Sequence, residues 1–230
     1  MRGTVARAGA VRAGAAAGIA GPAAFTGAWI AGSLRQTGHP AAEIQISGLA
    51  APDARDPWIM IAGFLVLGGC SAAFGAALRE ALGGRARAGV APTLIQVAGL
   101  ATIAAGLLRR DHMLLTSGAV SWHNHAHDVI SAAIYVDLVA AQLLLAARFG
   151  RDPWPRAPGE AGGPDTGGWR RWRPWLLASA GVTAAVLVAF AADTSAADAG
   201  ILQRVAVTIP LAVLAAVATR LLRTRTPASG

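Results

Sequence analysis

Six long apolar stretches constrain this chain more than any other feature. A bilayer core about 30 Å thick needs roughly 20 apolar residues as a helix, and each stretch approaches that length. The chain is 54% apolar and only 14% charged, whereas an ordinary soluble domain carries about a quarter charged residues. The sequence therefore predicts an all-α, polytopic membrane protein in which residues 1–230 form a single integral membrane domain. Its six predicted spans are about 13–34, 58–78, 90–108, 128–147, 175–192 and 205–222.

The placement of the arginines predicts which side of the membrane each loop faces. With six spans, fifteen of the 20 arginines fall in the two termini and in the loops after the second and fourth spans. Because cytoplasmic loops carry the excess of basic residues, both termini are expected in the cytoplasm. The Pro- and Gly-rich stretch at 150–168 is expected to be a flexible cytoplasmic linker. Since the arginines flank apolar runs, the net charge of +8 does not indicate nucleic-acid binding.

Histidines and acidic residues gather in the two outer loops nearest the N-terminus. The densest segment, 121–128, reads S-W-H-N-H-A-H-D. If the fourth helix begins a turn before its apolar run, His123 and His127 stand four residues apart on one face, a spacing that lets two imidazoles bind one metal ion. If the segment is extended instead, His125 shares a face with both of them. In a compact bundle, the two outer loops would share one mouth.

This segment leads to one predicted site with two sets of roles. As metal ligands, His123 and His127 would hold Zn²⁺ together with Asp111, which follows the third span. As catalytic groups, Asp111 or Asp128 would act as a base or orient a ligand, and Ser47 in the first outer loop would complete the site. We therefore predict that His123, His127 and Asp111 converge at the outer ends of the third and fourth spans.

The same residues also allow explanations without a metal. Histidines at a membrane surface serve as hydrogen-bonded structural groups, as ligand contacts, or as solvated side chains. Asn124 or Asp128 is well placed to cap the fourth helix, where an acidic group suits the positive end of the helix dipole. The sequence leaves these alternatives and metal ligation open.

An acidic residue in the middle of the fourth span is a second unusual feature. Asp137 lies in Y-V-D-L-V, at a depth where an ionisable group costs at least a few kcal/mol unless it is paired or hydrated. It is expected to face the bundle, to be largely neutral, and to lie beneath the polar mouth as its floor or as a proton-accepting site. The alternative is a carboxyl group that packs helices together through hydrogen bonds, with Gln96, Tyr135 or Thr183 as its partner.

Several segments resemble one known family. They are A-G-I-A-G-P-A-A-F-T-G-A-W-I-A-G in the first span, I-S-G-L-A at 46–50, W-I-M-I-A-G-F at 58–64, and R-D at 110–111 followed by S-W-H-N-H-A-H-D. These segments are similar to the six-span bacterial membrane proteins catalogued as domain of unknown function nine-nine-eight. The resemblance implies a six-helix protein of the bacterial plasma membrane and supplies no activity. It maps the family's pattern onto Ser47, Asp111, His123, His127 and Asp128, while His125 departs from that pattern.

A more distant likeness is to membrane hydrolases of the alkaline ceramidase type, which combine Ser, Asp and His residues around an intramembrane zinc. Three function hypotheses follow. The first is a metal-dependent enzyme, such as a hydrolase, that acts on a membrane lipid or a lipophilic small molecule at the outer leaflet. The second is a non-enzymatic small-molecule binding or transport protein. The third is an accessory membrane subunit whose polar loops contact a partner protein.

Overall fold

The computed structural model describes all residues except 1, 83–88, 115–118, 152–168, 193–197 and 224–230. Within this part the chain is helical and no residue lies in a β-strand, so the predicted all-α class is confirmed. Most of the predicted linker at 150–168 lies outside the described residues. The elements in chain order are α1 (Arg2–Arg35), the short 3₁₀-helix η1 (Ser47–Ala50), α2 (Pro57–Ala81), α3 (Val90–Leu107), α4 (Trp122–Arg151), α5 (Trp172–Ala192) and α6 (Ala199–Arg223).

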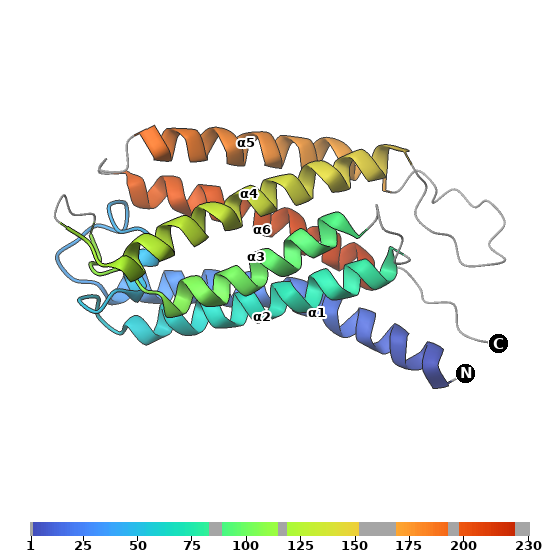
Figure 1. Cartoon of the computed structure of the whole chain (residues 1–230), viewed down its shortest axis with the longest axis horizontal. Coiled ribbons are helices and arrows are strands. Elements are labelled where there is room, and N and C mark those ends of the chain that lie inside the picture. Colours follow the sequence, from blue (N-terminus) through green and yellow to red (C-terminus); the bar gives the residue numbers. More distant parts are fainter. Residues whose placement is uncertain (1, 83–88, 115–118, 152–168, 193–197, 224–230) are drawn as a thin grey trace.

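The six long helices pack in chain order and close into a ring. Each α-helix contacts the next one along the chain, and α6 returns to contact α1, whereas α4 and α6 barely touch each other. The start of α1 and the end of α6 lie at the same end of the bundle (Figure 1). The loop between α1 and α2 lies at the opposite end, which we call the capped end.

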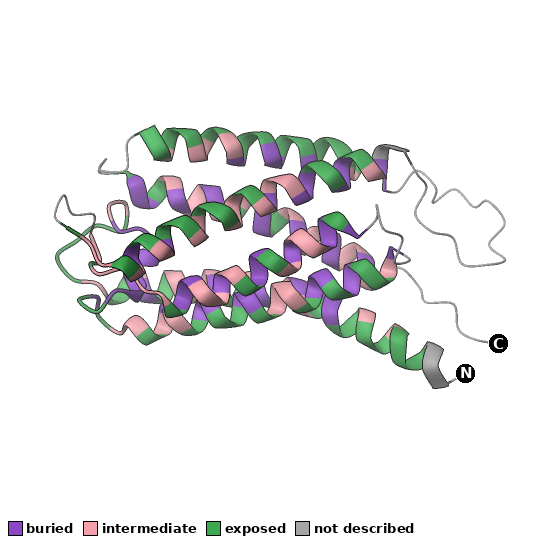
Figure 2. Cartoon of the chain, in the orientation of Figure 1, coloured by how far each residue is buried: buried purple, intermediate pink, exposed green. Residues whose placement is uncertain are grey.

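Five of these helices, α2 to α6, are long and apolar enough to cross a membrane. Their outer faces carry large apolar side chains such as Leu100, Val136 and Val188, which are 60%, 65% and 70% exposed. Figure 2 shows exposed residues along the outside of the bundle. So much apolar surface suits lipid rather than water. The chain is therefore a multi-pass membrane protein by length and composition, as predicted, although α1 is not among the five helices.

Two glycines let α2 and α3 approach each other closely. A Cβ atom added to Gly68 would lie 2.5 Å from the carbonyl oxygen of Gly99. A Cβ atom added to Gly99 would lie 2.6 Å from the backbone nitrogen of Ala72. Both distances are too short for real atoms, so the two backbones touch directly at this crossing. Small residues at membrane helix contacts allow this kind of packing.

Three helices begin at least six residues earlier than their apolar runs predict. The first residue of α4 is Trp122 rather than a residue near 128, α6 begins at Ala199 rather than near 205, and α1 begins at Arg2 rather than near 13. Helix formation does not require apolar residues, and the alanines before residue 13 are strong helix formers. Because α4 starts early, His123 and His127 lie four residues apart within its first turns.

A buried segment between α1 and α2 closes the capped end. Residues 44–50, which we call the cap segment, are all buried. At its start, Nη1 of Arg204 on α6 donates to the carbonyl oxygen of Ile44 at 2.8 Å. Gly48 lies against the carbonyl oxygen of Met113, where a Cβ atom would not fit. The cap segment is thereby held by α6 and by the loop that follows α3.

Candidate functional site

Asp111 and Ser121 anchor the loop between α3 and α4. The Asp111 carboxylate accepts hydrogen bonds from the backbone N–H of Ser121 at 2.6 Å and from its hydroxyl at 2.7 Å. These two bonds hold the pKa of Asp111 below its usual range. Ser121 in turn caps α4, because its Oγ accepts a hydrogen bond from the backbone N–H of Asn124 at 3.3 Å. The cap of the fourth helix is therefore Ser121, rather than Asn124 or Asp128.

His123 and His127 both turn a ring nitrogen toward the end of α3. Nδ1 of His127 lies 2.8 Å from the carbonyl oxygen of Ala105, and Nδ1 of His123 lies 3.2 Å from that of Arg109. The last carbonyl groups of a helix have no partner within the helix, so His127 supplies a donor to one of them, while His123 contacts the loop just after α3. His127 is only 2% exposed. The histidine pair thus ties the start of α4 to the end of α3.

The predicted metal ligands are only partly brought together. Nδ1 of His123 lies 3.5 Å from an Asp111 carboxylate oxygen, while His127 bonds to Ala105 instead. Asp128 accepts a hydrogen bond from Asn124 at 2.9 Å and is exposed, as is His125. Among the described residues, no group of three or more His, Cys, Asp or Glu side chains could hold a metal ion. The zinc site stays a prediction.

The loop between α1 and α2 contacts the loop between α3 and α4 at the capped end, as expected if the two loops share one mouth. The backbone N–H of Met113 donates to the Asp53 carboxylate at 2.7 Å, and Nδ1 of His112 lies 3.5 Å from the same carboxylate. Nη1 of Arg110 donates to the side-chain oxygen of Gln45 in the cap segment. Burial lowers the pKa of Arg110. Polar contacts at this mouth therefore bind the two loops to each other.

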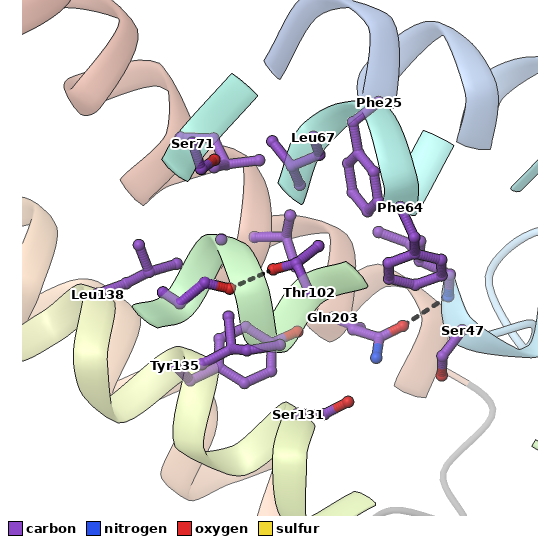
Figure 3. Close-up of a pocket in the computed structure, with 16 residues that line it drawn as sticks. Phe25, Ser47, Phe64, Leu67, Ser71, Thr102, Ser131, Tyr135, Leu138 and Gln203 are labelled. Carbon is purple, nitrogen blue, oxygen red and sulfur yellow. Dashed lines mark hydrogen bonds between the residues drawn. The ribbon is translucent and has the colours of Figure 1, made fainter. Parts of the chain in front are cut away.

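Directly beneath the cap segment, a cavity of about 60 Å³ lies inside the ring. It is lined by α1, α2, α3, α4, α6 and the cap segment, and none of its lining residues comes from α5. The edge-to-face pair of Phe25 and Phe64, with ring centroids 5.3 Å apart, forms part of its wall. Figure 3 shows the lining side chains. The polar residues among them are Ser47, Ser71, Thr102, Ser131, Tyr135 and Gln203.

Gln203 joins the cavity to the cap segment. Its side-chain oxygen accepts a hydrogen bond from the backbone N–H of Ile46 at 2.5 Å. Tyr135 on α4 also lines the cavity, and Figure 3 shows its hydroxyl pointing toward Gln203. Since α4 and α6 barely touch, these two polar side chains face the cavity from the two helices that it separates.

Of the predicted site residues, Ser47 alone lines this cavity. It is 5% exposed and lies in η1. The cavity residues on α4 and α6 were missed by sequence reasoning, although their spacing carries a signal. Ser131 and Tyr135 are four residues apart and so lie on one face of α4. A search for polar residues at this spacing would have found these two, whereas Gln203 has no polar partner at this spacing among the lining residues of α6.

Asp137 does not line the cavity. Tyr135 and Leu138 on the same helix do. At about 100° per residue, Asp137 projects about 160° away from Tyr135 and about 100° away from Leu138. The side chain is half-buried. Its predicted role as the floor of the mouth stays a prediction.

A family model described as "Protein of unknown function (DUF998)" matches residues 19–220. The match covers most of the chain, including the cap segment and every residue that lines the cavity. No curated protein matches the chain, and no solved structure does. The likeness to alkaline ceramidases is therefore not supported.

Proposed function

We propose that this chain, which belongs to the DUF998 family of proteins of unknown function, binds a lipid or another lipophilic small molecule in the cavity inside its helix ring. The cavity is the observation that carries this proposal. Small-molecule sites are concave and mostly apolar, with a few polar groups that fix orientation. The cavity has this character, because Phe25 and Phe64 share it with Tyr135 and Gln203. The proposal covers both non-enzymatic binding and transport.

The size of the cavity limits what it accepts. One water molecule needs about 10–15 Å³ by the same measure, so about 60 Å³ holds a handful of such groups. A whole phospholipid would not fit. We expect a small lipophile, or one end of a single-chain molecule, to enter.

We also propose that α1 is a sixth span and that both termini lie in the cytoplasm of a bacterium, with the protein in its plasma membrane. The excess of arginines at the termini and in the loops after α2 and α4 supports this orientation. The start of α1 and the end of α6 lie at the same end of the bundle (Figure 1). This arrangement fits a chain that crosses the membrane an even number of times. The capped end would then face outward.

Saturable photolabelling in nanodiscs tests the binding proposal. The probe is hexadecanol that carries a diazirine in its chain. Ser131 lines the cavity and its neighbour Ala132 is exposed on the same helix, so Ser131→Leu fills the cavity while Ala132→Leu adds the same side chain outside it. We expect Ser131→Leu to raise the concentration of unlabelled hexadecanol that halves the labelling about tenfold, which is equivalent to about 1.4 kcal/mol. Ala132→Leu should leave this concentration unchanged.

Two further points complete this test. Val207→Phe, which fills the cavity from α6, should repeat the result of Ser131→Leu, so that a folding defect in one variant does not decide the outcome. Labelling that is not saturable in the wild-type protein, or that is equal in all four proteins, would contradict the proposal.

A zinc-dependent enzyme is the first hypothesis from the sequence, and the described residues do not fit it well. The proximity of His123 to Asp111, at 3.5 Å, is the one contact in its favour. Metal analysis of the purified protein tests it directly. Stoichiometric zinc that is lost in both His123→Ala and His127→Ala, but kept in His125→Ala, would support it. The third hypothesis, an accessory subunit, has no specific contact in its favour.

A further inference from the structure

The polar side chains that line the cavity are one amide and several hydroxyls. Among the described residues that line it, none is Asp, Glu, Arg or His. An ionised group that entered would lose its hydration without gaining a counter-charge, which is strongly unfavourable. A neutral oxygen or nitrogen would find hydrogen-bond partners instead.

The two charged side chains nearest to the cavity in the sequence, Arg204 and Asp137, do not line it. Arg204 follows Gln203, but its Nη2 donates to the hydroxyl of Ser33 at 2.9 Å. Its guanidinium group also lies 5.2 Å from the centre of the Trp29 ring. Asp137 on α4 projects away from the cavity, as its angle to Tyr135 shows. Neither side chain therefore supplies a counter-charge to a ligand.

Gln203 retains hydrogen-bonding capacity for a ligand. A glutamine side chain offers two N–H donors and two acceptor lone pairs. The bond from Ile46 uses one lone pair. Further donor and acceptor positions remain on this side chain, which lines the cavity. A hydroxyl or carbonyl group of a buried ligand would form hydrogen bonds with them.

From this chemistry we propose that the ligand is an uncharged lipophile with a hydroxyl or carbonyl oxygen, and that Gln203 and Tyr135 recognise this oxygen. The inference rests on the proposed function and narrows it to a ligand class. The apolar wall formed by residues such as Phe64 and Leu211 would surround the adjoining part of the chain.

Competition among ligands of equal chain length tests the class. The protein in nanodiscs is labelled with the diazirine-bearing hexadecanol in the presence of one competitor at a time. The competitors are hexadecanol, palmitamide, palmitate, hexadecylamine and hexadecane. We expect hexadecanol and palmitamide to compete at least about tenfold better than the two charged compounds and better than hexadecane. Equal competition by palmitate or hexadecylamine would overturn the inference. Failure of every compound, hexadecane included, would overturn the proposed function as well.

Two variants test the recognising residues. Tyr135→Phe removes only a hydroxyl, and Gln203→Leu removes the amide together with the bond to Ile46. Both should reduce the preference for hexadecanol over hexadecane by about tenfold while hexadecane competes as in the wild type. Thr208→Val is the control, because Thr208 is exposed on the same helix as Gln203. An unchanged preference in Tyr135→Phe and Gln203→Leu would contradict their role.

Discussion

The buried imidazole of His127 performs a task that its spacing in the sequence does not reveal. The sequence correctly predicts that His123 and His127 share one helix face if α4 begins early. It does not predict that the His127 ring points to a backbone carbonyl group in the last turn of α3 and the His123 ring to one just past its end. Those carbonyls are present in every chain, so no residue type marks them. Two histidines four residues apart can therefore belong to a metal site or cap a neighbouring helix, and the sequence pattern is the same in both cases.

Replacement of His127 by alanine is expected to destabilise the protein. The change leaves the Ala105 carbonyl without its donor and empties a position that is 2% exposed, so we expect a loss of about 1–3 kcal/mol. His125→Ala, at an exposed position three residues from the N-terminus of α4, should stay within about 0.5 kcal/mol. Unfolding of the purified protein in detergent measures both. Equal stability of the two variants would exclude the capping role of His127.

Asp111 is expected to make the stability of the loop between α3 and α4 sensitive to acid. The Ser121 donors lower the pKa of Asp111 in the folded state, so its contribution is fully present above the value of about 3.9 for an unfolded chain. It is lost as the pH falls through the lower folded pKa. We expect Asp111→Asn to show a smaller fall in thermal stability below about pH 4 than the wild type. Parallel curves for the two proteins would contradict this account.

At the scale of elements, apolar runs predict the helices well and their ends less well. The predicted spans at 58–78 and 90–108 correspond to α2 and α3 within a few residues. The apolar run predicts a late start for α4 because the first turn of this helix is polar, although Ser121 supplies a good cap. Polar residues form helices when their backbone groups are satisfied. Hydropathy alone therefore does not locate this helix end.

The close crossing of α2 and α3 gives a sharp comparison between adjacent glycines. A Cβ atom on Gly68 would overlap the Gly99 backbone, whereas a Cβ atom on Gly69 would meet nothing within 4 Å. We expect Gly68→Ala to lower stability by about 1–3 kcal/mol, because the helices must separate. Gly69→Ala should be neutral or slightly stabilising. Thermal unfolding in detergent measures the difference, and similar values for both variants would rule out this helix contact.

At the scale of the whole molecule, the cavity could not be predicted from the sequence. Its lining comes from five helices and the cap segment, so its existence depends on how each helix is rotated within the ring. Helices that are apolar on nearly all sides carry little information about rotation. The sequence thus predicts a multi-pass bundle and a mouth where two loops meet. It identifies Ser47 as a site residue but not the other residues that line the cavity with it.

The orientation of the molecule can be tested with single cysteines. In a Cys70→Ala background, Thr37→Cys lies at the capped end, and Gly162→Cys lies outside the described residues, in the predicted cytoplasmic linker. We expect an impermeant thiol reagent added to intact cells to label Thr37→Cys only, because the arginine-rich side remains in the cytoplasm. Labelling of Gly162→Cys alone would reverse the orientation. Labelling of both would require a different number of spans.

The location of a bound lipophile tests the central claim most directly. The wild-type protein in nanodiscs is photolabelled with the diazirine-bearing hexadecanol, and the modified residues are mapped by mass spectrometry with and without excess hexadecanol. The account predicts adducts on the cavity faces of α4 and α6, around Tyr135 and Val207, that disappear with the competitor. Adducts confined to lipid-facing residues such as Val182 and Val188 on α5, and unaffected by the competitor, would contradict it.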